Sequence, residues 1–228
     1  MSQSHSIVNA AGLTDTGLVR EENQDCIHVD PEFGLYIVLD GMGGHRGGAA
    51  AAMMGREVMT DIIGRGYGSK DPGQLLVDAC KAAGQAIHKR ANQDHELRGM
   101  GTTVVAALMP QPDVAIIAHV GDSRAYLMRE RRLQRLTSDH TIVAELVAAG
   151  KISPEQAVDH PHASVLSRNL GGHAKTDVDL SVVQLQPGDR IMMCSDGLNG
   201  YAAQAAIEHV LGGALDARSA TQDLVDLA

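Results

Sequence analysis

Three apolar segments of this sequence each end in an aspartate that adjoins a glycine. The segments read YIVLDG, IIAHVGDS and IMMCSDG, and their aspartates are Asp40, Asp122 and Asp196. Each pair by itself is common turn chemistry, because Asp and Gly favour hairpin turns. Carboxylates that converge at strand ends, however, stay ionised together only with positive charge between them, and a divalent cation supplies that charge. The pattern alone leaves three turns and one metal site as open alternatives.

The composition predicts a globular domain and argues against several partners. Apolar residues make up 44% of the 228 residues, enough for a full core. The net charge of −9 disfavours nucleic acid, because clustered Lys and Arg are needed to bind its phosphates. The same charge suits a phosphorylated substrate only where bound cations reverse the local field.

Cysteine usage and hydropathy bear on the cellular compartment. Cys26, Cys80 and Cys194 are odd in number and widely spaced, which supports neither a disulfide framework nor a structural zinc site. We find no apolar run of transmembrane length and no signal-peptide core, so we expect a cytoplasmic protein without a membrane partner.

Strand-like and helix-like segments occur in groups, and we see no linker or internal repeat. Strands are expected at 6–13, 25–29, 35–41, 101–109, 114–123, 124–130 and 132–137, with a hairpin over 178–197 that turns at 186–189. Helices are expected at 48–63, 72–94, 139–152 and 153–160, and from about 203 and 216. This grouping predicts a single α+β domain with largely antiparallel sheets. Thr102 and Thr103 are interpreted as strand core residues.

Six segments, in order, resemble the signatures of bacterial PP2C-type (PPM) protein serine/threonine phosphatases. They are GLVREENQD, LDGMGGH, GMGTT, AHVGDSRAYL, LTSDHTIVAELVAAGKISPEQAVDHP and PGDRIMMCSDGL, and the likeness extends over residues 7–228. The resemblance implies a four-layer αββα sandwich with two Mn²⁺ or Mg²⁺ ions at one end and a flap over about 139–167. The family usually closes with a Gly-Gly-x-Asp-Asn strand that carries a further metal ligand, and no such segment follows in this sequence.

The resemblance also implies roles for individual residues. Asp40 corresponds to the carboxylate that bridges both metals, and Asp25 to an acid that acts through metal-bound water. Arg20 corresponds to the arginine that grips the substrate phosphate, and His45 is a candidate general acid for the leaving group. The remaining expected metal ligands are the carbonyl of Gly41, the carboxylate of Asp196, and, for a third ion, Asp122 and Ser164.

The expected activity is therefore hydrolysis of phosphoserine and phosphothreonine in proteins by a metal-activated water. The expected partners are phosphoproteins and a cognate serine/threonine kinase, and the chain is expected to be a monomer. The alternative is a non-catalytic phosphatase-like regulator that binds phosphoproteins. The missing terminal aspartate favours the regulator, whereas the retained Arg20, Asp25, Asp40, Asp122 and Asp196 favour the enzyme.

Overall fold

The strands form two antiparallel sheets. The computed structural model describes residues 8–228, apart from the side chains of residues 45 and 46. The first sheet has the order β1-β2-β4-β5-β8, with β3 paired to β2, and the second has the order β7-β6-β9. The strand bounds are β1 Asp25–Asp30, β2 Leu35–Met42, β3 Gly101–Thr102, β4 Val104–Gln111, β5 Val114–Val120, β6 Arg124–Arg129, β7 Arg132–Arg135, β8 Asp179–Gln184 and β9 Arg190–Cys194.

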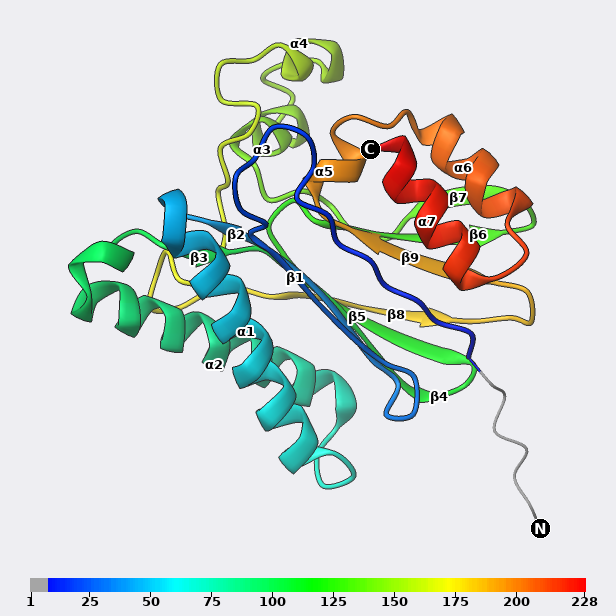
Figure 1. Ribbon diagram of the computed structural model, residues 1–228, viewed down its shortest axis with the longest axis horizontal. Helices are drawn as coiled ribbons and strands as arrows, with labels where there is room; N and C mark the ends of the chain where they lie inside the picture. The colour runs from blue at the N-terminus through cyan, green and yellow to red at the C-terminus, as the bar shows by residue number, and fades with distance from the viewer. Residues whose placement is uncertain (1–7) are drawn as a thin grey trace.

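Helices cover the outer face of each sheet. Figure 1 shows α1 and α2 on one side of the sandwich and α6 and α7 on the other. The helix bounds are α1 Gly44–Gly66, α2 Pro72–Gln93, α3 Ile142–Ala148, α4 Pro154–Val158, α5 Asp196–Asn199, α6 Gln204–Gly213 and α7 Ala217–Leu227, with a 3-10 helix η1 at His95–Leu97.

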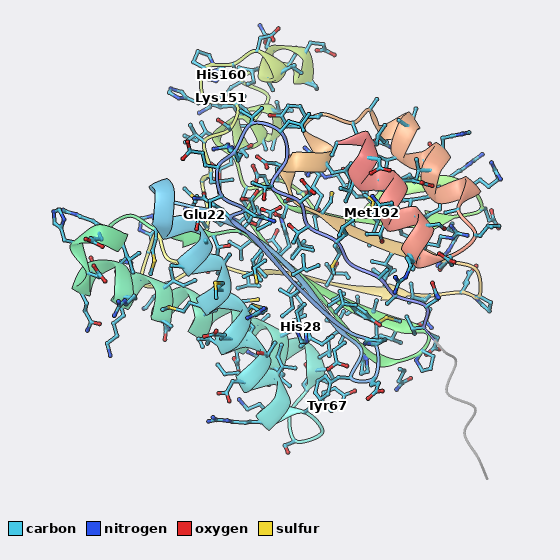
Figure 2. The ribbon with its side chains drawn as sticks, in the orientation of Figure 1. Glu22, His28, Tyr67, Lys151, His160 and Met192 are labelled. Carbon is cyan, nitrogen blue, oxygen red and sulfur yellow. The ribbon has the colours of Figure 1, made fainter. Side chains whose placement is uncertain are left out.

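Three apolar clusters separate the four layers. On β4, Val104 and Leu108 pack against α1 and α2, whereas Val105 points into the space between the sheets. This alternation follows from the two-residue repeat of a strand that is buried on both faces. Met192 of β9 belongs to a third cluster beneath α6 and α7 (Figure 2). The predicted αββα sandwich is therefore confirmed.

Local sequence signals place several helix starts correctly. Asp71 caps α2 by accepting a hydrogen bond from the backbone N–H of Gln74, and Pro72 occupies the first turn. Ser153 and Gln156 form a reciprocal capping box at the start of α4. Each of these side chains accepts a hydrogen bond from one of the free backbone N–H groups in the first turn of its helix.

Two expectations about strands are wrong. Residues 8–13 of the expected first strand are not in a strand. The expected hairpin also does not form, because β8 pairs with β5 in one sheet while β9 pairs with β6 in the other. The turn at 186–189 instead passes from sheet to sheet, and Asp189 holds it by accepting hydrogen bonds from Arg129 and from the backbone N–H of Gln186.

The segment 139–167, which we call the flap segment, contains α3 and α4. It extends beyond the edge of the sandwich in Figure 1, and Figure 2 labels Lys151 and His160 on it. Among the helices of residues 8–228, none is both long and apolar enough to cross a membrane.

Candidate metal centre

The carboxyl of Asp40 lies at the centre of an acidic cluster. Asp25 is its register partner across the β1–β2 pair, and both Asp25 and Asp196 lie within hydrogen-bonding reach of it. Burial, followed by the negative charges of Asp25, Asp196 and Asp122, raises the pKa of Asp40 to about 9. The largest charge effects on Asp40 all come from carboxylates, which repel one another when ionised.

Asp122 joins the cluster from the turn between β5 and β6. Burial first, and then the charges of Asp196 and Asp139, raise its pKa to about 6. Asp196 is exposed at the start of α5, and one residue separates it from the end of β9. The three aspartates at strand ends, together with Asp25, therefore lie close enough for their charges to act on one another.

Hydroxyl groups hold the backbone of Asp40 in place. The N–H of Asp40 donates to Oγ1 of Thr103 at 3.0 Å, and its carbonyl accepts from Oγ1 of Thr102 at 2.9 Å. Oγ1 of Thr103 also lies 2.7 Å from Oγ of Ser123, the residue after Asp122. Thr102 and Thr103 are buried, as expected, but they also fix the central carboxylate.

Close backbone packing explains the glycine after Asp40. A Cβ on Gly41 would overlap the carbonyl oxygen of Gly48 and approach that of Gln24 to 2.7 Å. The N–H of Gly41 donates to the same Gln24 carbonyl at 3.1 Å. The end of β2 can therefore lie against the start of α1 only where residue 41 has no side chain.

The donor set fits hard divalent cations. Buried carboxylates that repel one another are stabilised by a cation between them, and Mn²⁺ and Mg²⁺ prefer oxygen ligands. Asp40, Asp25 and Asp196 are the carboxylates that would hold such ions. The cluster therefore has the charge and chemistry to bind such ions.

The other expected site residues are described less fully. Arg20 is exposed in the loop before β1, and Ser164 is exposed on the flap segment. The side chain of His45 lies outside the described part of the chain, although its backbone belongs to the first turn of α1. The roles expected for these three residues stay predictions.

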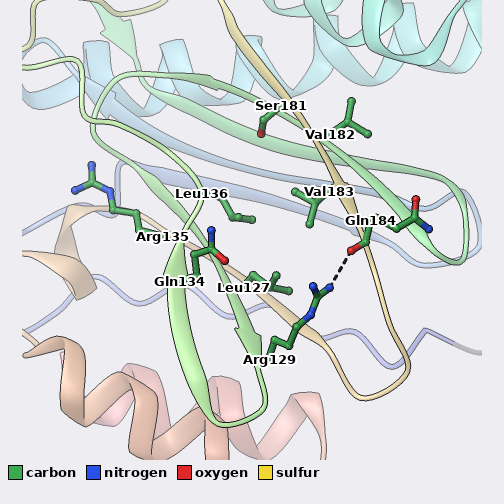
Figure 3. A pocket seen from close by; sticks show the side chains of 9 residues that line it. All are labelled: Leu127, Arg129, Gln134, Arg135, Leu136, Ser181, Val182, Val183 and Gln184. Carbon is green, nitrogen blue, oxygen red and sulfur yellow. Dashed lines mark hydrogen bonds between the residues drawn. The ribbon is translucent and has the colours of Figure 1, made fainter.

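A groove elsewhere on the molecule has no connection to this cluster. It encloses about 420 Å³ between the β6–β7 hairpin and β8, and Arg129 donates to the carbonyl of Gln184 across it at 2.8 Å (Figure 3). None of the expected site residues lines it. The acidic cluster, and not this groove, is therefore the candidate functional site.

Sequence comparison identifies the family. The family model for protein phosphatase 2C matches residues 19–226, which is most of the chain. The chain belongs to the protein phosphatase 2C family. This PP2C chain is 37% identical to the serine/threonine phosphatase stp of Listeria monocytogenes over 90% of its own length and 83% of that protein. It is 34% identical to the serine/threonine protein phosphatase PstP of Mycobacterium tuberculosis, covering 92% of this chain and 40% of PstP.

Solved structures agree with this assignment. The crystal structure of the M. tuberculosis phosphatase PstP aligns with a TM-score of 0.84 at 32% identity, over 95% of this chain and 90% of that one. A structure of the PstP catalytic domain in complex with two manganese ions aligns equally well, with a TM-score of 0.84 over 95% and 89% of the two chains. The expected family and fold are confirmed, and these relatives, named as phosphatases, give no support to the non-catalytic alternative.

Proposed function

We propose that this PP2C chain hydrolyses phosphoserine and phosphothreonine in proteins and depends on Mn²⁺ or Mg²⁺. The observation that carries the proposal is the position of Asp40, whose half-buried carboxyl is flanked by Asp25 and Asp196 at the ends of separate strands. The names of the relatives and the two manganese ions bound to the PstP catalytic domain support it.

The acidic residues have different roles in binding the metal ions. Asp40, the carbonyl of Gly41 and Asp196 would hold the two ions. Asp25 would act through metal-bound water, and Asp122 and Ser164 would hold a third, weaker ion. When bound, the ions lower the pKa of water and neutralise phosphoryl oxygens.

Two further side chains act on the substrate. Arg20, exposed in the loop before β1, donates paired hydrogen bonds to the phosphate oxygens. His45 gives a proton to the leaving serine or threonine oxygen, because an imidazole has a pKa suited to general acid catalysis near neutral pH.

The substrates in this proposal are proteins phosphorylated by a serine/threonine kinase in the cytoplasm, and the flap segment shapes which of them bind. The chain acts as a monomer and as one domain.

Hydrolysis of a phosphothreonine peptide tests the proposal. We expect turnover with Mn²⁺, loss of turnover in EDTA, and loss in Asp40→Asn even at high Mn²⁺. The matched control is Asp223→Asn, which removes an exposed carboxylate from α7. Full turnover in EDTA would refute the metal-dependent mechanism.

A further inference from the structure

His140, the second residue of the flap segment, is bonded to the turn that carries Asp122. The backbone N–H of His140 donates to the carbonyl of Gly121 at 2.8 Å. The N–H of Gly121 in turn donates to Nδ1 of His140 at 3.1 Å. Both halves of this reciprocal pair end on the residue immediately before Asp122, and His140 is only 2% exposed.

His140 also holds the far end of the flap segment. Its carbonyl accepts from the N–H of Ser167 at 2.9 Å. Its Nε2 lies 3.2 Å from Oδ2 of Asp179 on β8, and Asp179 accepts from Arg168 at 2.8 Å. His140 therefore contacts the last residue of the flap segment through its backbone and β8 through its imidazole.

An ion pair between Arg124 and Asp139 also connects the Asp122 turn to the flap segment. Asp139 accepts two hydrogen bonds from Arg124, at 3.0 Å and 2.7 Å, and is also paired with Arg135. Because Arg124 is two residues after Asp122, the Asp122 turn is bonded to the start of the flap segment on both sides. On its inner side, Ser123 contacts Thr103, which in turn bonds the backbone of Asp40.

The neighbouring His119 raises the question of a second metal site. Ligand atoms of His119, His140 and Asp179 lie within 4.8 Å of one another. Nδ1 of His140 already accepts a backbone N–H, however, so a neutral imidazole carries its proton on Nε2, toward Asp179. A metal-binding histidine needs the opposite arrangement, with a bare nitrogen toward the metal and N–H on the other side. The contacts therefore favour a proton-sharing link over a cation site.

We propose that His140 is a positioning residue that couples the flap segment to the Asp122 turn. It acts through the Gly121 N–H, which fixes the backbone that presents Asp122, and through its carbonyl and Asp179, which fix the end of the flap segment. Its role in catalysis rests on the proposed function, in which Asp122 is a metal ligand.

Two substitutions of His140 separate its two side-chain contacts. His140→Asn places an amide oxygen near the position of Nδ1 and keeps an acceptor for the Gly121 N–H. His140→Gln reaches toward Asp179 but removes that acceptor. His119→Leu is the matched control, because His119 is equally buried at 2% exposure and its two ring nitrogens have no hydrogen-bond partner among the described residues.

Amide hydrogen exchange of the metal-free protein is the first measurement. We expect His140→Gln to speed exchange at residues 121–124 by about tenfold or more, because local opening becomes easier. His140→Asn and His119→Leu should leave these amides near the wild-type rate. The second measurement is the Mn²⁺ concentration for half-maximal hydrolysis of a phosphothreonine peptide, which should rise about tenfold in His140→Gln alone, as for lost outer-shell partners of a metal site.

An unchanged exchange rate at residues 121–124 in His140→Gln would overturn the inference. So would an exchange rate that increases in His140→Asn or His119→Leu as much as in His140→Gln. The exchange measurement needs no enzymatic activity. A wild-type chain that fails to hydrolyse the peptide would therefore refute the proposed function and leave the exchange result to decide the role of His140.

Discussion

The hydroxyl of Ser195 donates a 2.6 Å hydrogen bond to Oδ2 of Asp25, although the two residues are 170 positions apart. Ser195 is the N-cap residue of α5, yet its side chain makes no capping hydrogen bond and is turned to Asp25 instead. The bond joins the end of β9 in one sheet to the start of β1 in the other. It also favours the ionised form of Asp25, against the burial that raises the pKa of this carboxyl.

Ser195→Ala therefore releases Asp25 without removing an acidic residue. We expect the Mn²⁺ concentration for half-maximal activity to rise about tenfold, as for other outer-shell partners of metal sites. The measurement is hydrolysis of a phosphothreonine peptide over a Mn²⁺ series. Ser181→Ala on β8, outside the acidic cluster, is the control. A wild-type Mn²⁺ response in Ser195→Ala would show that this hydrogen bond is dispensable.

The metal-free protein should lose stability as the pH rises. The pKa of Asp40 is raised from 3.8 to about 9, and that of Asp122 from 3.8 to about 6. Between the ordinary and raised values the folded chain binds more protons than the unfolded chain, so the free energy of unfolding falls with increasing pH. In EDTA, Tm should fall more steeply over this range in the wild type than in Asp40→Asn.

Saturating Mn²⁺ should reverse the trend, because the ions bind ionised carboxylates and stabilise the folded state. The gain in Tm on adding Mn²⁺ is thus expected to grow with pH. Identical pH profiles for the wild type and Asp40→Asn in EDTA would contradict the raised pKa of Asp40.

Gly41→Ala should be strongly destabilising. The new Cβ would overlap the carbonyl oxygen of Gly48, so the end of β2 or the start of α1 must move. We expect a loss of about 2 kcal/mol or more in the free energy of unfolding, measured by urea denaturation in EDTA. Gly64→Ala is the matched control, because a Cβ there meets open space within α1 and should stabilise the helix by about 0.5–1 kcal/mol. Equal effects of the two substitutions would refute the close-packing argument.

Arg20→Ala tests the phosphate contact. Removing a charged donor from the phosphate should raise KM for the phosphopeptide about tenfold or more, because hydrogen bonds to charged groups contribute about 1.5–3 kcal/mol. Arg218→Ala, which removes an exposed arginine from α7, should leave KM unchanged. If the Arg20→Ala enzyme keeps the wild-type KM, Arg20 does not bind the substrate phosphate.

The sequence was sufficient to predict which strands end in aspartates, but the pattern alone did not decide between separate turns and one shared site. A run such as YIVLDG specifies a buried strand and a turn at its end, and antiparallel pairing brings Asp25 opposite Asp40. Helix starts such as Asp71 and Ser153 were also predictable, because capping depends on residues within one turn.

Pairing partners were not predictable in the same way. The segments 178–185 and 190–197 read as a hairpin, but a local turn signal does not encode that β5 and β6 offer each strand a different free edge. Ser195, Ser123 and His140 were missed as supporting residues. Each of these residues contacts a residue that is distant in the sequence. The residues next to a serine or histidine in the sequence do not indicate which distant residue its side chain contacts.

Anomalous diffraction from crystals grown with Mn²⁺ is the most direct test of the acidic centre. The account predicts two Mn²⁺ peaks that share the carboxylate of Asp40, with Asp196 at one of them, and no peak between His119, His140 and Asp179. Mn²⁺ bound at the histidine pair with none at Asp40 would contradict it.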